Sequence, residues 1–288
     1  MQIYINGEYY DKDDARISVF DHGLLYGDGV FEGIRVYANK VFRLDEHLER
    51  LYESAKAIDL TIPLPFPELK RDVLAAVRRN ALPDAYIRLI VTRGEGNLGL
   101  NPYTCGTPSV IIIVDQIALY PRELYQKGLA VITVATQRNL PEAVNPRIKS
   151  LNYLNNILAK IEAINAGVEE AIMLNSFGLV AECAGDNIFA IRKGTILTPS
   201  ISMGVLEGIT RNTVIQMARE QGIEVKQLVM TRHDLFIADE CFLTGTGAEI
   251  IPVIKIDGRV IGDGKPGKMT KDLMASYHRL TREEGVPV

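Results

Sequence analysis

Lys149 is the side chain around which a reaction centre can be assembled from this sequence. It lies in the run Asn145 to Tyr153, just past the midpoint of the chain, and a helix-forming stretch from 155 to 166 begins soon after it. Most lysines at such junctions are solvated charges. An amine that reacts with a carbonyl group must instead be partly desolvated, and it needs neighbours that anchor the captured molecule. The chain must therefore also supply anion-binding groups, a counter-charge and a substrate pocket.

Three segments have residue types that bind an anion. Gly208 to Arg211 opens a predicted helix, whose first N–H groups and dipole favour a negative charge. Thr244 to Gly247 follows a predicted strand and offers backbone donors together with hydroxyl groups. Arg50 carries a guanidinium that suits a phosphate. Each segment also has an ordinary interpretation, as a helix cap, a turn and a surface ion pair, so none of them identifies a ligand alone.

Glu182 supplies the counter-charge. It lies in the run Val180 to Asn187, among small residues and between two predicted strands, where an ionised carboxylate is costly unless it meets a cation. A protonated ring nitrogen is such a cation. The amine, the anion sites and the carboxylate together are the parts of a pyridoxal phosphate site.

The composition is that of an ordinary globular protein, with 47% hydrophobic and 24% charged residues in 288 positions, a length that favours two domains. A net charge of −4 without a Lys/Arg-rich block argues against nucleic acid as the main partner. No apolar run approaches the roughly 20 residues that span a bilayer. The cysteines form no pair, the histidines have no metal-ligand spacing and no export signal is visible, so we expect a cytoplasmic protein without a metal site.

The order of predicted elements indicates an α+β protein of two domains rather than a doubly wound sheet. Residues 1–120 form the smaller N-terminal domain, 121–130 the interdomain loop and 131–288 the larger, cofactor-binding domain. The glycines between 19 and 35 indicate a loop where the backbone passes close to another group. Helices are predicted at 44–58, 67–80, 154–166, 209–221 and 270–283, strands at 30–37, 85–92, 109–114, 130–136, 171–174, 187–192, 195–197, 225–230 and 240–244, and hairpins around 6–7 and within 254–260.

Two glycine-rich stretches imitate nucleotide-binding motifs. Gly94 to Gly99 matches GxGxxG after a strand, but prolines at 102 and 108 leave no room for the helix of ~10 or more residues that must follow. Gly262 to Lys268 resembles GxxxxGK, but Met269 stands where a Mg²⁺-binding hydroxyl is needed. We therefore predict no nucleotide site at either stretch.

The order and spacing of the site motifs resemble those of the fold type IV pyridoxal-phosphate enzymes, and most closely those of the branched-chain amino acid aminotransferases. The resemblance covers nearly the whole chain and implies the two-domain α+β fold of that group, with pyridoxal phosphate as cofactor. The motifs that carry it are His47 to Leu51, Ile148-Lys149, Glu182 before Asn187 to Phe189, Leu206 to Arg211, and Thr244 to Thr246.

By this resemblance Lys149 is the catalytic Schiff-base lysine that shuttles a proton, and Glu182 pairs with the pyridine nitrogen. Tyr153 meets the phenolic oxygen of the cofactor, and its phosphate is held by Arg50, Ile209, Thr210 and Thr246. The other cofactor-binding residues that the resemblance implies are Leu206, Gly208 and Gly245.

The resemblance also implies where the substrate binds. Phe31 and Gly33 shape the side-chain pocket, Tyr26 comes from the partner subunit of a dimer, and Tyr86 and Arg88 hold the α-carboxylate and the distal carboxylate of glutamate. The complete implied substrate set is Tyr26, Phe31, Gly33, Arg35, Tyr86, Arg88, Thr246 and Gly247.

The implied reaction moves an amino group between L-leucine, L-isoleucine or L-valine and 2-oxoglutarate by a ping-pong mechanism. The implied assembly is a homodimer or higher homo-oligomer with an active site shared between subunits. Cys183 and Gly247 replace the glycine and alanine that are usual in the family, which leaves the detail of the pocket open rather than the chemistry.

Three alternatives share the fold. A D-amino acid aminotransferase also has a Lys-Ser-Leu-Asn run, but it carries an Arg-x-His carboxylate trap where this chain has Asn97 to Leu100, without a cation. An aminodeoxychorismate lyase is compatible with Glu182 followed by Cys183, whereas the run Phe31 to Arg35 favours a transferase. A binding protein without turnover is the non-enzyme alternative, and the complete set of cofactor residues argues against it.

Overall fold

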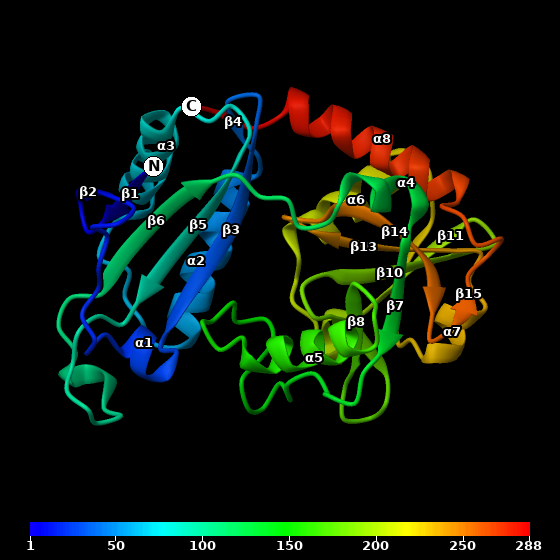
Figure 1. Cartoon of the computed structure of the whole chain (residues 1–288), viewed down its shortest axis with the longest axis horizontal. Coiled ribbons are helices and arrows are strands. Elements are labelled where there is room, and N and C mark those ends of the chain that lie inside the picture. The colour runs from blue at the N-terminus through cyan, green and yellow to red at the C-terminus, as the bar shows by residue number, and fades with distance from the viewer. The chain divides into compact units, whose positions relative to one another are not determined.

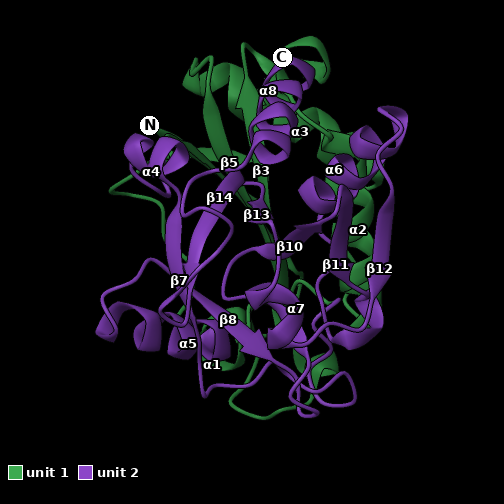
Figure 2. Cartoon of the chain, turned by 90° about the vertical axis from the view of Figure 1, so that its right-hand side faces the viewer, with its two compact units in different colours: residues 1–117, 148–152, 281–288 green, residues 118–147, 153–280 purple.

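The computed structural model describes every residue from 1 to 288, and its contacts divide the chain into two compact units (Figure 2). Unit 1 comprises Met1–Ile117, Ile148–Asn152 and Thr281–Val288, and unit 2 comprises Ala118–Arg147 and Tyr153–Leu280. The segment that contains Lys149 and the C-terminal segment therefore belong to unit 1, although both follow the predicted interdomain loop in sequence.

Unit 1 is built on a seven-stranded antiparallel sheet. Its strands are β1 (Gln2–Ile5), β2 (Glu8–Asp11), β3 (Gly29–Tyr37), β4 (Lys40–Val41), β5 (Ala85–Thr92), β6 (Ser109–Asp115) and β16 (Val286–Pro287). They follow the order β16-β4-β3-β5-β6-β1-β2, of which Figure 1 labels β1 to β6. The C-terminal segment joins unit 1 because β16 adds a strand to the edge of this sheet.

Two helices cover one face of this sheet (Figure 1). Helix α2 (Leu44–Ala57) packs on β3, and helix α3 (Phe66–Asn80) packs on β1 and β6. Both have acidic residues in the first turn, where the helix dipole favours negative charge. Their apolar faces and the inward side chains of the strands form one hydrophobic core.

Residues 148–152 lie along the start of β3. The Leu151 N–H donates to the Gly29 carbonyl at 2.9 Å, and the Phe31 N–H donates to the Lys149 carbonyl at 3.0 Å. These backbone bonds make the segment a short addition to the sheet. They explain why Lys149 lies among residues that are distant from it in sequence.

Unit 2 contains a mixed sheet of nine strands. They are β7 (Leu129–Thr133), β8 (Glu170–Leu174), β9 (Val180–Cys183), β10 (Asn187–Arg192), β11 (Thr195–Pro199), β12 (Val225–Leu228), β13 (Glu240–Gly245), β14 (Glu249–Ile256) and β15 (Arg259–Val260). The order is β12-β11-β10-β13-β14-β7-β8-β9, and β15 pairs with β14. The pairs β11–β12, β14–β7 and β7–β8 are parallel.

Five helices accompany this sheet. They are α4 (Arg122–Lys127), α5 (Leu154–Asn165), α6 (Ile209–Glu220), α7 (Arg232–Phe236) and α8 (Lys268–Glu283). Helix α4 packs on β14, α5 on β8, and α6 on β12 and β13. No helix of the chain has the length and apolar composition needed to cross a membrane.

Most predicted elements are confirmed with small shifts at their ends, and the exceptions have physical reasons. Helices α4 and α1 (His22–Tyr26) lie in segments predicted as loops, and α7 lies in a segment without a predicted element, because such short helices carry too little periodicity to be recognised. The strand before the last hairpin begins at Glu249 rather than 254. The prediction that Glu182 lies between strands is wrong, because it lies within β9, where all four residues are buried.

Neither glycine-rich stretch has the geometry of a nucleotide site. Between β5 and β6 there is only the single-turn 3-10 helix Pro102–Thr104, so no α-helix follows Gly94 to Gly99. Helix α8 does follow the second stretch, but the Glu240 carboxylate accepts hydrogen bonds from the Thr270 N–H and hydroxyl at 2.8 and 2.7 Å. A carboxylate of the chain itself thus occupies the place that a phosphate would take.

A buried ion pair joins α2 to β3. Arg50 Nε and Nη2 donate to the two Glu32 carboxylate oxygens at 2.7 and 2.8 Å, and His47 Nδ1 lies 2.7 Å from Glu32 Oε2. All three side chains are buried. Burial by itself raises the pKa of Glu32, but Arg50 and His47 outweigh it and hold that pKa well below its usual range. Arg50 is therefore a fixed, buried cation rather than a solvated surface charge.

Glu32→Gln is expected to lower the free energy of unfolding at pH 7 by about 3 kcal/mol or more, because it leaves Arg50 buried without its carboxylate. Since the folded-state pKa of Glu32 is depressed, the stability from its ionisation is complete above the unfolded value of about 4.3. That stability is lost as the pH falls below this value and through the folded-state pKa. Urea denaturation at pH 7 and at successively lower pH measures both effects.

Glu46→Gln is the matched control, because Glu46 pairs with Arg43 at 3.2 Å at the partly exposed start of the same helix. It should cost less than about 1 kcal/mol, as exposed pairs do. Equal losses in the two variants would contradict a structural role for the buried pair.

Candidate active site

The predicted site residues divide into two groups, one in each unit. Unit 1 holds Tyr26, Phe31, Gly33, Arg35, Arg50, Tyr86, Arg88 and Lys149, and unit 2 holds Tyr153, Glu182, Leu206, Gly208, Ile209, Thr210, Gly245, Thr246 and Gly247. Each group draws its residues from several strands and connecting segments of its unit.

In unit 1 the lysine lies on an aromatic ring. Lys149 Nζ is 4.6 Å from the centre of the Phe31 ring, and the Lys149 N–H donates to Ser54 Oγ at 3.2 Å. The lysine is half-buried. An aromatic face replaces part of the water around an ammonium group. Lys149 therefore has the partial desolvation that a reactive amine needs.

The same ring contacts a second cation. The guanidinium carbon of Arg88, on β5, lies 4.6 Å from the centre of the Phe31 ring, and Arg88 Nη2 donates to the Tyr86 hydroxyl at 3.4 Å. Gly33 faces Arg88 across the strand pair, and a Cβ on Gly33 would lie 1.8 Å from the Tyr86 hydroxyl oxygen. Glycine is thus required for Tyr86 to lie over β3. An apolar ring beside two cations can receive an apolar side chain as well as a carboxylate.

Arg35 and Tyr26 have other neighbours in the structure. Arg35 lies on the same face of β3 as Phe31 and Gly33, because every second residue of a strand shares a face. Its guanidinium carbon lies 4.9 Å from the centre of the Tyr37 ring. The Tyr26 hydroxyl donates to the Leu98 carbonyl at 2.5 Å. Tyr26 is thereby attached to the loop after β5.

In unit 2, Glu182 is held by three donors. Arg138 Nε donates to Glu182 Oε1 at 2.7 Å, and Asn187 Nδ2 and the Leu206 N–H each donate to Oε2 at 3.0 Å. Asn187 also donates to the Leu206 carbonyl at 3.0 Å. Donors of this kind stabilise the ionised form of a buried carboxyl group. Glu182 is therefore a fixed anion of the type that pairs with a protonated ring nitrogen.

The start of α6 lacks a side-chain cap. Its N-cap residue is Gly208, so the first N–H groups of the helix, those of Ile209 and Thr210 included, receive no side-chain hydrogen bond. A Cβ on Gly208 would lie 2.1 Å from Asn187 Oδ1, so the glycine lets the helix start lie against the residue that holds Glu182. Uncapped N–H groups at a helix start favour an anion.

The end of β13 offers further polar groups beside Asn187. Thr244 pairs with Asn187 across the sheet, and its buried hydroxyl has no hydrogen-bond partner. Gly245, Thr246 and Gly247 follow it and are half-buried. A buried hydroxyl without a partner is costly, so a bound ligand would compensate it. The uncapped helix, this hydroxyl and the anchored carboxylate fit the phosphate and ring nitrogen of pyridoxal phosphate.

Tyr153 and Cys183 complete the predicted cofactor region. Tyr153 is the half-buried N-cap residue of α5. Cys183 ends β9, and its side chain belongs to the hydrophobic core of unit 2. Burial raises the pKa of its thiol well above the usual range. The departure from glycine at this position is therefore absorbed by the core.

The sequence-based prediction missed residues that hold the site residues in place. Glu32 has a recognisable signal, because a carboxylate inside an otherwise apolar strand needs a buried partner. Arg138 and Asn187 have none, because they lie in polar surroundings in sequence and meet Glu182 only in the fold. The Ser54 hydroxyl likewise meets the Lys149 backbone across 95 positions.

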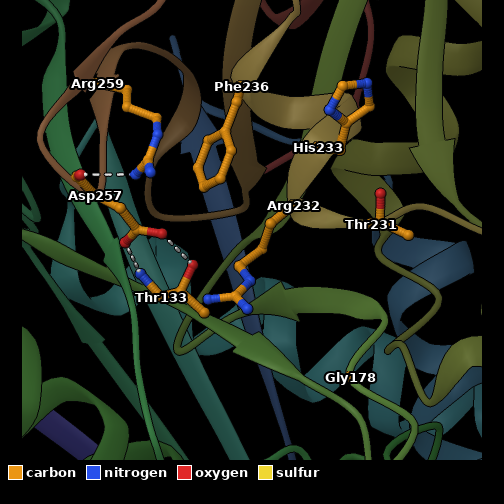
Figure 3. A pocket seen from close by; sticks show the side chains of 8 residues that line it. All are labelled: Thr133, Gly178, Thr231, Arg232, His233, Phe236, Asp257 and Arg259. Atoms are coloured by element: carbon orange, nitrogen blue, oxygen red, sulfur yellow. Dashed lines mark hydrogen bonds between the residues drawn. The ribbon is translucent and has the colours of Figure 1, made fainter.

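A hollow of about 620 Å³ in unit 2 is lined by none of the predicted site residues (Figure 3). Asp257 accepts hydrogen bonds there from the Thr133 N–H and hydroxyl at 2.6 and 2.8 Å, and the Arg259 guanidinium lies 4.3 Å from the Phe236 ring centre. These groups contact one another, and no lysine lines the hollow. Its lining residues are Thr133, Gly178, Thr231, Arg232, His233, Phe236, Asp257 and Arg259.

Comparison with known proteins places this geometry in a family. The model of the amino-transferase class IV family matches residues 29–256. A protein of Methanocaldococcus jannaschii, provisionally named a branched-chain-amino-acid aminotransferase, is 50% identical over 288 residues, which are 100% of this chain and 99% of that protein.

Solved structures agree with the sequence relatives. The crystal structure of the Escherichia coli branched-chain amino acid aminotransferase superimposes with a TM-score of 0.95 at 36% identity, covering 99% of this chain and 95% of that one. The Thermobaculum terrenum branched-chain amino acid aminotransferase, solved in its PLP holo-form, gives a TM-score of 0.90 at 33% identity, covering 98% and 94%. With a matching family model over most of its length and relatives that span it almost completely, the chain belongs to the class IV aminotransferases.

Proposed function

We propose that this protein is a branched-chain amino acid aminotransferase that uses pyridoxal phosphate. It moves the amino group between L-leucine, L-isoleucine or L-valine and 2-oxoglutarate in two half-reactions. The observation that carries the proposal is the group of Lys149, Phe31 and Arg88, where one aromatic ring contacts a half-buried amine and a guanidinium. The activity named for the relatives supports the same assignment.

Lys149 and Glu182 have complementary roles in the proposed mechanism. When bound, pyridoxal phosphate supplies an aldehyde for the amino group and a ring that accepts negative charge from the substrate Cα. Lys149 accepts the proton that leaves Cα and, in the second half-reaction, returns a proton to that atom. Phe31 holds the side chain of Lys149 in place, because Nζ lies 4.6 Å from the centre of its ring. Glu182 holds a proton on the ring nitrogen.

The remaining cofactor residues bind the two other polar parts of the cofactor. We assign the phosphate to Arg50, to the uncapped N–H groups of Ile209 and Thr210, and to Thr246. Tyr153 meets the phenolic oxygen. Leu206, Gly208 and Gly245 contribute backbone, which in the case of Leu206 also orients the Glu182 carboxylate.

The substrate pocket must accept an apolar side chain in one half-reaction and a carboxylate in the other. Phe31 and Gly33 provide the apolar surface, Arg88 provides the cation for the distal carboxylate of glutamate, and Tyr86 holds the α-carboxylate. Tyr26 completes the pocket from the partner subunit. Because the loop from 94 to 100 has no cation for a carboxylate trap, L-substrates are favoured over D-substrates.

Lys149→Ala should abolish covalent attachment of the cofactor and lower kcat at least about 10²-fold to 10⁴-fold, because it removes the general base. The reconstituted wild-type protein should show a visible absorption band that borohydride removes. Peptide mass spectrometry should then find the reduced cofactor attached to Lys149. The exposed Lys56→Ala is the control and should keep band and activity. A wild-type protein without the band after reconstitution would refute the proposed function.

Arg88→Ala should lower kcat/KM for L-glutamate about tenfold more than for L-leucine, since only glutamate presents a distal carboxylate to the guanidinium. A panel of L and D amino donors with 2-oxoglutarate as acceptor measures this difference. Arg71→Ala, at an exposed position of α3, is the control. Equal losses for both donors would exclude Arg88 as the distal-carboxylate residue, and activity with D-donors alone would indicate a D-amino acid aminotransferase instead.

The proposed assembly is a homodimer in which α5 contacts a second copy of the chain. One side of α5 exposes five large apolar side chains, with exposed fractions from 45% to 68%. Water contact with such a stripe is unfavourable, so a second protein surface would cover it. The stripe consists of Leu154, Ile157, Leu158, Ile161 and Ile164.

We place the protein in the cytoplasm, which its three free cysteines support.

Ile157→Asp with Ile161→Asp should halve the mass measured by analytical ultracentrifugation, because two carboxylates cannot be buried in an apolar interface without partners. Gln216→Asp adds a carboxylate at an exposed position of α6, away from the stripe, and should leave the mass unchanged. A double variant that keeps the wild-type mass would place the interface elsewhere.

A further inference from the structure

Arg138 is a buried arginine that none of the proposed catalytic steps uses. It lies beyond the end of β7, where its N–H donates to the Leu174 carbonyl at 2.8 Å, and it is only 8% exposed. Its Nη1 lies 3.2 Å from Asn139 Oδ1 and 3.4 Å from Asn156 Oδ1. Asn156 is itself fixed, because its Nδ2 donates to the Ala184 carbonyl at 2.8 Å. The guanidinium therefore has one defined orientation.

That orientation directs Nε at the carboxylate that the proposed function assigns to the cofactor ring. The distance from Arg138 Nε to Glu182 Oε1 is 2.7 Å, and Glu182 is only 4% exposed. The other two donors named for this carboxylate, the Asn187 amide and the Leu206 N–H, are neutral and bind Oε2. Among these three donors only Arg138 carries a charge, and Arg211 of the same unit also interacts electrostatically with Glu182.

Compensation of this kind decides the protonation state of a buried acid. Without a nearby cation, burial favours the neutral carboxyl group, which can no longer hold a proton on a ring nitrogen. Each unit by which the pKa of such a group lies above the working pH reduces its ionised fraction about tenfold. A neutral replacement at position 138 would therefore weaken the ring contact without touching the cofactor.

We propose that Arg138 is a positioning residue that keeps Glu182 ionised and directs its carboxylate at the ring nitrogen of pyridoxal phosphate. The inference rests on the proposed function, because it concerns the same cofactor. It adds a residue of a different kind, one that acts only through Glu182 and only on cofactors that have a ring nitrogen.

The test compares two cofactors on the full-length apoprotein. Pyridoxal phosphate has the ring nitrogen, and 1-deazapyridoxal phosphate has a C–H group in its place. Arg138→Met should weaken binding of pyridoxal phosphate about tenfold or more while changing the affinity for the deaza analogue less than about threefold. Equilibrium titration followed by absorbance gives both dissociation constants without reference to turnover.

Arg138→Lys is the conservative variant and keeps a cation at the same place. It should retain most of the wild-type preference for pyridoxal phosphate over the deaza analogue, and it serves as the folded comparison if Arg138→Met does not fold. Arg192→Gln is the control, because Arg192 donates only to the Ile237 carbonyl in the same unit. Glu182→Gln should remove the cofactor preference, and adding Arg138→Met to it should cause no further loss.

Two outcomes would overturn the inference. Equal weakening of both cofactors by Arg138→Met would indicate a purely structural role. Loss of the preference in Arg138→Lys to the level of Glu182→Gln would show that the charge at position 138 does not act on Glu182. A wild-type protein that fails to bind pyridoxal phosphate would instead refute the proposed function.

Discussion

An ionised carboxylate that leaves water needs a cation and fixed hydrogen-bond donors, and this requirement organises the candidate site residues of each unit. In unit 1, Glu32 on β3 is held by Arg50 from α2. In unit 2, Glu182 on β9 is held by Arg138 from the segment after β7. Each pair links two elements and fixes the direction of a charged group before a ligand binds. Groups that are already oriented need little reorganisation during a reaction.

The amine is positioned by a different interaction. Backbone hydrogen bonds join residues 148–152 to the start of β3, and they bring Lys149 against Phe31. Because backbone pairing does not depend on the lysine side chain, the place of the amine and its reactivity are set by separate parts of the structure. Backbone bonds locate the residue, and the aromatic ring desolvates its amine.

In the proposed substrate pocket, one close contact in the same sheet brings polar and apolar residues together. The absence of a side chain at Gly33 lets the Tyr86 hydroxyl lie over β3, where it meets Arg88. Arg88 in turn contacts the Phe31 ring. The polar and apolar parts of the pocket thus adjoin each other, which is what a site needs when an aliphatic side chain and a carboxylate bind in turn.

The sequence by itself determined the main elements and the kind of chemistry. The apolar repeat from 44 to 58 predicted α2, and a lysine, the helix start at Gly208 to Arg211 and an isolated glutamate predicted a pyridoxal phosphate site. Only the tertiary structure decided that Glu182 lies inside a strand, that Lys149 belongs with the first sheet, and that Arg138 is the partner of Glu182. The physical reason is the sequence separation of the interacting residues. Helix and strand periodicity depends on neighbours a few residues apart, whereas Arg138 and Glu182 are separated by 44 positions and meet only through strand pairing.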